Sequence, residues 1–344
     1  MKLKQIQGFS LTELMIVMAI SLLVFSGVIG LFIASDDTLD DALQRGEMQE
    51  NGRLALSFIA QDIMMSGYWG RYSGKPIHLI SGAESGSVRL DQVDGNTLAV
   101  SGTDCIGEGE NNGTFFIEDS DFYFRHLWGM KVQSSSIYAG CITDAKTGSD
   151  SIQIKRAIGQ EVVAGSEDSR RIYFISNANQ GIFYAGSDPT PALAEGLICE
   201  YQHHLYYVTE ESRGDILVPV LKRKYLYKAD DALTHQARMR VASLVEGVEH
   251  LGFLYGVDTD LDGAVNFYES AANLTRAHWE QDGGQIVAVR VAILIRALQP
   301  SAGVNNTNQY DLGSYQVEVN DNYRRLLFTQ TVKILNSGEK VWRS

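Results

Sequence analysis

The stretch GFSLTELMIVMAISLLVFSGVIGLFIAS, residues 8–35, decides how the rest of this 344-residue chain is arranged. From Leu14 to Ala34 it carries no charged side chain, and a helix of that length spans about the 30 Å of a bilayer core. One carboxylate, Glu13, stands at the front of this run, where a charge costs roughly 2.5 kcal/mol or more. The sequence therefore predicts a membrane helix with an acidic residue near its start, and the cost of that charge indicates that Glu13 has a specific role.

The flanks of this apolar run predict its orientation. Lys2 and Lys4 precede it, and aspartates follow it at positions 36, 37, 40 and 41. Because positive charge is retained in the cytoplasm, we expect the amino end inside and the remainder of the chain exported. Ser35-Asp36-Asp37 offers no secretory cleavage site of small residues, so we expect the apolar segment to be retained.

Helical periodicity continues beyond the membrane segment. Pairs of apolar residues recur at a spacing of four and predict an apolar face that needs a partner surface: Leu39 and Leu43, Leu54 and Phe58, Ile59 and Ile63. We therefore expect residues 1–8 to be a leader, 9–35 the membrane half of one long helix, 36–66 its amphipathic half and 67–344 a head.

The head reads as β-sheet. Short alternating runs are separated by Gly, Asn, Asp and Ser, and β-α alternation is absent, which favours an antiparallel sheet and an α+β fold class. The expected strands are 87–90, 97–101, 114–117, 151–156, 171–176, 181–184, 203–209, 218–227, 250–257, 286–297 and 324–334. A short helical turn is expected early in RVASLVEGVEHLGFLYGV, residues 240–257, and a division into two sub-sheets near residue 165.

Composition limits the class of function. A net charge of −13 and a pI near 5.0 argue against nucleic-acid binding, which needs clustered Lys and Arg. A hydrophobic content of 44% with 21% charged residues is typical of a folded chain. No combination of nucleophile, base and orienting residue predicts an enzyme.

The amino end resembles a type IV prepilin. The leader MKLKQIQ is followed by Gly8, Phe9 and, as the fifth residue after the glycine, Glu13. The resemblance implies that an inner-membrane prepilin peptidase cuts between Gly8 and Phe9 and methylates the new amine. Near a helix start, a carboxylate is also favoured by unpaired N–H groups and the helix dipole. The family implies that Glu13 pairs with the amine of a neighbouring subunit during assembly.

Later blocks are similar to the PilW-type minor pilins and span most of the chain. They are ALSFIAQDIMMSGYWG (55–70), HLYYV (204–208), PVLKRKYL (219–226), LVEGVEHLGFLYGVDTDLDGAV (244–265), IVAVRVAILIRA (286–297) and YRRLLFTQTVKILN (323–336). This resemblance implies the type IV pilin fold, in which a long helix packs on a β-rich head. It also implies residence first in the inner membrane and then in the cell-surface pilus.

The implied function is that of a minor pilin that helps to initiate type IV pilus assembly. Its implied partners are other minor and major pilins at or near the filament tip, with a large adhesin-like partner. Two alternatives stay open: a J-like pseudopilin of type II secretion, and an adhesion module with a calcium-ordered loop. Whether the pilus serves twitching, adhesion or DNA uptake is left open by the sequence.

The segment DTDLDGAVNFYE, residues 258–269, satisfies the pattern D-x-D-x-D-G-x5-E of a calcium loop. Calcium binds six to eight oxygens, and the glycine at the sixth position permits a sharp turn. The expected ligands are Asp258, Asp260, Asp262, the Ala264 carbonyl, Glu269 and, as a further candidate, Asn266. The strand-like flanks indicate an isolated calcium loop with a structural role, and the alternative is a solvated acidic turn.

Three cysteines lie in the exported part, where oxidation is permitted. Cys105 and Cys141 both stand in turn-rich sequence, which favours their pairing, although spacing cannot fix connectivity and Cys199 is the alternative partner. Three buried free thiols are the other interpretation. His203 and His204 are neighbours in an expected strand, so their side chains point to opposite faces, which argues against one shared metal. We expect them to be a surface pair.

Overall fold

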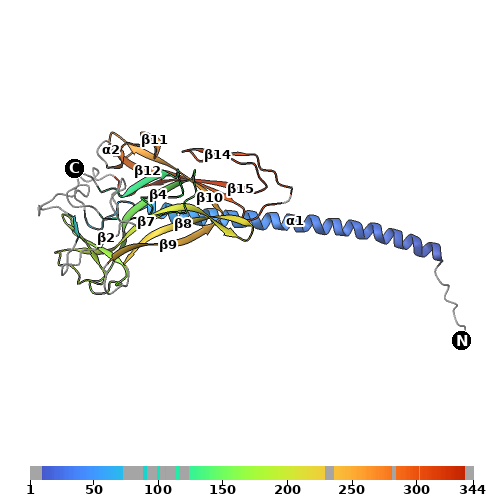
Figure 1. The fold of residues 1–344 in the computed structure, drawn as a ribbon, viewed down its shortest axis with the longest axis horizontal. Helices are drawn as coiled ribbons and strands as arrows, with labels where there is room; N and C mark the ends of the chain where they lie inside the picture. Colours follow the sequence, from blue (N-terminus) through green and yellow to red (C-terminus); the bar gives the residue numbers. More distant parts are fainter. Residues whose placement is uncertain are drawn as a thin grey trace, which may run out of the picture. The chain divides into compact units, whose positions relative to one another are not determined.

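The computed structural model describes residues 10–72, 88–90, 99–100, 105, 114–115, 124–228, 236–280, 284–301 and 303–337 (Figure 1). Gly8 and Phe9 lie outside the described residues, as do parts of the strand expected at 114–117. The chain divides into two compact units, Met1–Gln49 and Glu50–Ser344. The first unit is helical and the second is the β-rich head.

Helix α1 (Leu11–Met64) is a single helix of 54 residues that runs through the boundary between the two units. Its segment Leu11–Phe32 is long and apolar enough to cross a membrane, and all of its side chains are exposed. The helix ends at Met64, just before Gly67, whose φ of +72° is a conformation that glycine adopts without steric cost. A long apolar helix followed by an antiparallel head confirms the predicted α+β, pilin-like fold.

Within the head unit, the buried face of α1 combines two small residues with two isoleucines. Gly52, Ala55, Ile59 and Ile63 are buried at spacings of three and four, whereas Leu54 remains 39% exposed. A Cβ atom on Gly52 would lie 2.3 Å from the Phe328 ring, so the glycine lets the helix approach the sheet closely. Ile59 and Ile63 are therefore buried as expected, whereas one turn earlier the close approach of helix and sheet places Gly52 in the contact and leaves Leu54 partly exposed.

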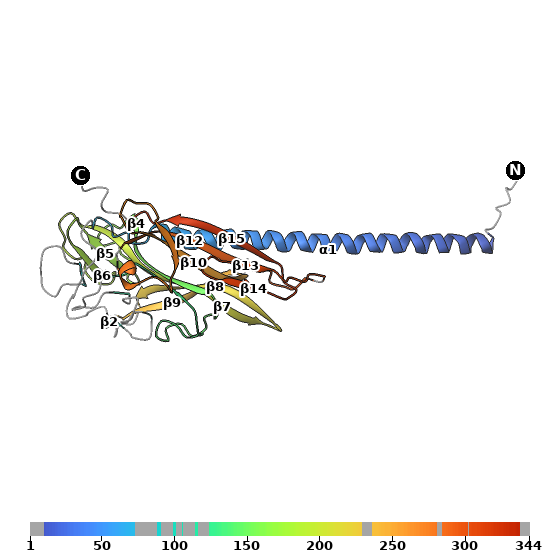
Figure 2. The ribbon, with the colours of Figure 1, turned by 90° about the horizontal axis from the view of Figure 1, so that it is seen from above.

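The head contains a nine-stranded sheet in the order β1-β6-β5-β7-β8-β9-β2, with β4 pairing with β3 and β7 (Figures 1 and 2). Its strands are β1 (Val88–Leu90), β2 (Ala99–Val100), β3 (Leu127–Lys131), β4 (Asp150–Glu161), β5 (Ile172–Ser176), β6 (Gly181–Ala185), β7 (Leu197–Arg213), β8 (Ile216–Lys228) and β9 (Gln236–Glu246). Only the short pairs β1·β6 and β2·β9 are parallel among these strands, so the described sheet is mainly antiparallel.

A four-stranded sheet in the order β11-β10-β12-β15 follows it along the chain. Its strands are β10 (Val248–Asp258), β11 (Phe267–Ser270), β12 (Gln285–Arg296) and β15 (Arg325–Lys333); helix α2 (Arg276–Trp279) and the hairpin of β13 (Gln309–Asp311) and β14 (Gln316–Glu318) complete the described elements. All three strand pairs of this sheet are antiparallel.

The change of sheet occurs at Gly247. Its N–H donates to the Pro219 carbonyl of β8, and its own carbonyl accepts from the Arg296 N–H of β12, so one residue joins both sheets. Its φ of +83° suits glycine. Strand β4, before residue 165, and strands β5 and β7, after it, belong to the same nine-stranded sheet.

Most of the expected strands match observed ones, and the differences are specific. Residues 240–246 form strand β9 and not a helical turn, because they pair along β8. Strands β3, β11, β13 and β14 were not expected from the pattern; all are five residues or shorter and therefore show little alternation.

An aromatic core lies under the nine-stranded sheet. The Trp69 ring packs against Phe174, Phe183 and Tyr201, with centroid separations of 5.8, 6.2 and 6.0 Å. Trp69 stands directly after the end of α1, so the chain segment leaving the helix is held by this core.

Candidate functional site

The described chain begins with a hydrogen-bonded helix cap that contains Glu13. The Ser10 N–H donates to Glu13 Oε2 at 2.9 Å, and the Thr12 N–H donates to Ser10 Oγ at 3.3 Å. The first helical residue is Leu11, so Ser10 is the N-cap and Glu13 is the third helical residue, as in a capping box. The spacing Ser-x-x-Glu was a sequence signal for this cap that the predictions did not use.

This cap gives Glu13 a role inside its own subunit. Its carboxylate satisfies an N–H that the first turn of a helix cannot pair internally. One carboxylate oxygen, Oε1, accepts no hydrogen bond in the described part of the chain. The side chain can therefore cap its own helix while the second oxygen stays open to a further donor.

The three aspartates of the predicted calcium loop lie together. Carboxylate oxygens of the buried Asp258 and the exposed Asp260 and Asp262 lie within 4.8 Å of one another, so this triad could bind a metal. Asp258 is 1% exposed and accepts from the N–H groups of Leu261 and Gly263, each at 2.7 Å. Burial acts to raise the pKa of Asp258, but these N–H groups outweigh burial and hold the pKa below its usual value.

Glu269 does not join this triad. It pairs with Tyr255 across β10 and β11, whereas Asp258 follows Val257, so the two carboxylates point to opposite faces of the hairpin. Glu269 instead accepts from Asn273 Nδ2 and the Ser270 N–H, both at 2.9 Å, and these bonds lower its pKa.

Two other residues of the predicted ligand set also bond within the loop, Ala264 through its N–H and Asn266 through its side-chain oxygen. The Ala264 N–H donates to Asp262 Oδ1 at 2.7 Å, and Asn266 Oδ1 accepts from the Thr259 N–H at 2.6 Å. The β10–β11 connection is therefore a hydrogen-bonded turn that brings together three of the six predicted calcium ligands.

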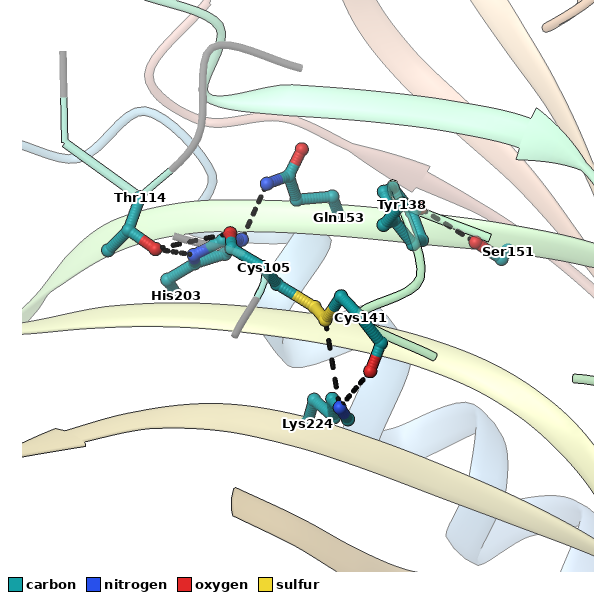
Figure 3. The surroundings of a disulfide bond; sticks show 8 residues. All are labelled: Cys105, Thr114, Tyr138, Cys141, Ser151, Gln153, His203 and Lys224. Carbon is teal, nitrogen blue, oxygen red and sulfur yellow. Dashed lines mark hydrogen bonds between the residues drawn. A yellow bond between two sulfur atoms is a disulfide. The ribbon is translucent and has the colours of Figure 1, made fainter. Parts of the chain in front are cut away.

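Cys105 and Cys141 form a disulfide with a Cα–Cα distance of 5.1 Å (Figure 3). The bond links the segment before β3 to the turn between β3 and β4. The Lys224 ammonium on β8 donates to the Cys141 carbonyl, which ties this turn to the nine-stranded sheet. Cys199 is a buried free thiol, and burial raises its pKa to about 11.

A buried polar cluster around Asp62 was missed from the sequence. Asp62 Oδ1 accepts from Arg156 Nη2 of β4 at 2.7 Å, and Oδ2 accepts from His204 Nδ1 and the Tyr206 hydroxyl of β7. Burial acts to raise the pKa of Asp62, but His204 and then Arg156 outweigh it and hold the pKa below its usual range. One acid between Ile59 and Ile63 on an apolar helix face was the available signal.

The pair His203 and His204 is buried, so the expectation of a surface pair was wrong. The His203 ring contacts Thr114 Oγ1 at 2.8 Å and Gln153 at 2.5 Å (Figure 3), whereas His204 reaches Asp62. The neighbours point in opposite directions because strand side chains alternate. Burial and then the nearby Lys155 lower the pKa of His203 well below its usual value.

Two family models match this chain. Residues 3–29 match the Prokaryotic N-terminal methylation motif, which includes Gly8, Phe9 and Glu13. Residues 205–336 match the family described as Type IV Pilus-assembly protein W, from β7 through β15. Searches of curated proteins and of solved structures found no match.

The methylation motif, the apolar helix and the antiparallel head define a prepilin-like protein of the type IV pilus class. Residues 205–336, from β7 to β15, are similar to the PilW type IV pilus-assembly family, and residues 3–29 carry the amino-terminal methylation motif. Proteins of that family are generally structural pilins without catalytic activity. The match to it and the prepilin-type motif imply that other pilins and a prepilin peptidase are partners.

Proposed function

We propose that this chain is a minor pilin that helps to initiate type IV pilus assembly at or near the filament tip, in a complex with other minor pilins. The observation that supports this proposal is the combination of a methylation motif at residues 3–29 with a PilW match in the head. A large adhesin-like protein at the tip is a further proposed partner.

Processing is proposed to occur between Gly8 and Phe9, followed by methylation of the Phe9 amine. Lys2 and Lys4 stand before the membrane segment and support an amino end in the cytoplasm. The Cys105–Cys141 disulfide supports a head in the oxidising periplasm. The chain would then move from the inner membrane to the surface pilus.

Packing and charge pairing are the proposed assembly mechanism. In lipid there is little hydrophobic drive between apolar helices, so close packing and polar contacts supply the specificity. We propose that the open Oε1 of Glu13 accepts from the amine of a neighbouring subunit while Oε2 keeps the Ser10 cap. A buried ammonium and a carboxylate each gain from this pairing.

Deletion of the gene tests the proposal. We expect surface filaments, counted by electron microscopy, to fall at least tenfold, and expression of the unmutated chain from a plasmid should restore them. Mass analysis of sheared filaments should detect this chain, cut before Phe9, at low abundance. Normal filament numbers with impaired export of a secreted protein would contradict the proposal and favour a J-like pseudopilin.

We also propose that the triad Asp258, Asp260 and Asp262 binds calcium as a structural ion. With one oxygen each, the three carboxylates supply three of the six to eight oxygens that calcium binds, and backbone or water oxygens would complete the set without Glu269. In this structural role, calcium would order the β10–β11 loop. The alternative is an adhesion role, in which that loop contacts a ligand.

Calcium binding is tested by thermal unfolding of the full chain with calcium, magnesium or chelator. Saturation at about 100 times Kd should stabilise the fold by about 2.7 kcal/mol. Asp260→Asn and Asp262→Asn should lose this effect, and Asp215→Asn, an exposed acid between β7 and β8, should keep it. Equal unfolding temperatures of the unmutated chain with calcium and with chelator would refute the site.

A further inference from the structure

The outer edge of the four-stranded sheet is formed by β15, which pairs with β12 on one side only. The Ala297 N–H donates to the Arg324 carbonyl, and the Ile334 N–H donates to the Val287 carbonyl. In an antiparallel pair such residues alternate, so even-numbered residues of β15 point their backbone groups at β12. Odd-numbered residues point theirs outward.

Four outward residues form an open edge: Leu327, Thr329, Thr331 and Lys333. Each has one N–H and one C=O, which makes eight backbone groups with no protein partner among the described residues. All four side chains are exposed. The next outward N–H, that of Leu335, donates to the Met64 carbonyl, so the end of α1 closes the edge there.

Between Arg325 and Lys333, this edge lacks the features that usually protect an exposed strand. From Leu326 to Val332 it carries no charge, proline or glycine, and its pairing with β12 has no bulge. Exposed edges of this kind pair readily with another extended chain, and natural proteins normally block them. An unblocked edge of this length therefore indicates a partner.

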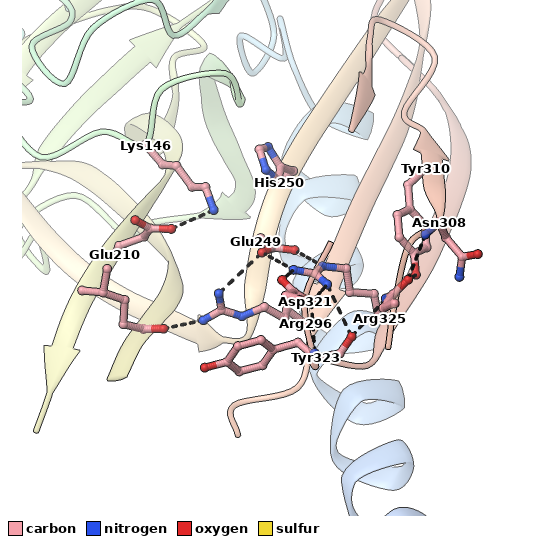
Figure 4. A network of polar contacts seen from close by, with 12 residues as sticks. Lys146, Glu210, Glu249, His250, Arg296, Asn308, Tyr310, Asp321, Tyr323 and Arg325 are labelled. Atoms are coloured by element: carbon pink, nitrogen blue, oxygen red, sulfur yellow. Dashed lines mark hydrogen bonds and ion pairs between the residues drawn. The ribbon is translucent and has the colours of Figure 1, made fainter. Parts of the chain in front are cut away.

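The edge strand is also held in place before any partner arrives. At its start, Arg325 forms ion pairs with Glu249 of β10 and Asp321, as Figure 4 shows. Further along, the Phe328 ring lies against Gly52 of α1. A rigid edge loses little conformational entropy on binding, which favours addition of a strand.

We propose that the β15 edge binds an extended strand of a different pilin-type subunit, adding a fifth strand to the sheet. This proposal rests on the proposed function in pilus assembly. Backbone groups supply the attraction, and an acidic residue of the partner opposite Lys333 would supply selectivity. A second copy of this chain fits less well, since β15 contains no acidic residue that self-pairing could place opposite Lys333.

The test places a photo-crosslinking residue at Gln330 of the full chain in its own cell, and identifies the linked peptide by mass spectrometry. Thr329→Pro removes an outward N–H without removing a bond to β12, so it should cut the cross-link to a different pilin-type subunit at least tenfold. Thr329→Val keeps the N–H and should retain the cross-link. The unfolding temperature of each variant checks that the head remains folded.

Leu327→Lys with Thr331→Lys is a second variant that leaves the backbone unchanged and should also abolish the cross-link. A cross-link to a second copy, no cross-link, or one that survives Thr329→Pro would overturn the proposal. If gene deletion removes filaments and Thr329→Pro restores them fully, the edge proposal fails while the pilus function stands. If deletion leaves filaments intact, the proposed function itself fails.

Discussion

Asp62 of helix α1 and Arg156 of strand β4 form a buried ion pair with an N–O distance of 2.7 Å, and His204 and Tyr206 share the same carboxylate. This cluster fastens the last turns of the helix to the nine-stranded sheet. We expect Asp62→Asn to lower the free energy of unfolding by about 3–5 kcal/mol, because it leaves the Arg156 charge buried without a partner.

The matched control for Asp62→Asn is Glu246→Gln, which removes a partly exposed ion pair with Arg213. It should cost less than about 1 kcal/mol. Chemical unfolding of the detergent-solubilised full chain measures both variants. Equal small effects would show that the buried cluster contributes little to stability.

Gly52→Ala should destabilise the head by about 1–3 kcal/mol, since its Cβ would lie 2.3 Å from the Phe328 ring. The control is Gly46→Ala in the same helix, where a Cβ meets nothing within 4 Å. Alanine favours a helix by about 1 kcal/mol over glycine, so Gly46→Ala should stabilise slightly. Thermal unfolding measures both; stabilisation by Gly52→Ala would contradict close packing at this position.

Removal of the disulfide by Cys105→Ala with Cys141→Ala should cost about 4 kcal/mol on the loop-entropy estimate for a sequence separation of 36. The measurement is the unfolding temperature with and without reductant. Reductant should lower the unfolding temperature of the unmutated chain and leave that of the double variant unchanged. An equal fall in the unfolding temperature of the unmutated chain and of the double variant would show that the reductant acts on something other than this disulfide.

Acid should destabilise the head between about pH 7 and pH 4. Burial lowers the pKa of His126 and His250 to about 4 and that of His203 well below its usual value, while unfolded histidines take up protons near pH 6.5. The unfolded state therefore binds more protons in this range, and stability is lost as pH falls. Each pKa unit corresponds to about 1.4 kcal/mol.

Asp150 opposes this trend and provides the control. Burial raises its pKa to about 6, so its folded carboxyl binds a proton first and contributes stability as pH falls towards 4. Unfolding curves from pH 7 to pH 4 should show a shallower loss for His203→Gln and a steeper loss for Asp150→Asn. A steeper loss for His203→Gln or a shallower loss for Asp150→Asn would contradict these assignments.

Glu13 variants separate helix capping from charge pairing. Glu13→Gln keeps an oxygen that can accept from the Ser10 N–H and removes the charge, whereas Glu13→Ala removes both. If the charge attracts a neighbouring amine, both variants should be cut after Gly8 but enter filaments at least tenfold less. Immunoblots of membranes and sheared filaments measure this. Normal incorporation of Glu13→Gln would assign the residue to capping alone.

The sequence predictions were accurate for features set by residues close together in the chain and less accurate for features set by residues far apart in it. The membrane run, the methylation motif and the long alternating strands are local patterns, and all are present. The prediction of a calcium loop at residues 258–269 relied on the spacing of oxygen-bearing residues along the chain. The β10–β11 register, however, places the Glu269 side chain on the face of the hairpin opposite Asp258. A linear pattern does not contain that register, because it depends on the pairing of two strands.

The sequence by itself determined the amino-terminal helix and the motif at Gly8, Phe9 and Glu13, since a run of about twenty uncharged, mainly apolar residues needs no tertiary contact to specify a helix that can cross a membrane. The tertiary structure decided which helix face is buried, because helix–sheet distance selected Gly52 over Leu54. It also decided that Asp62 and His204 meet across 142 positions, and that β15 keeps an open edge. These features depend on which strands become neighbours, and only the folded chain sets that.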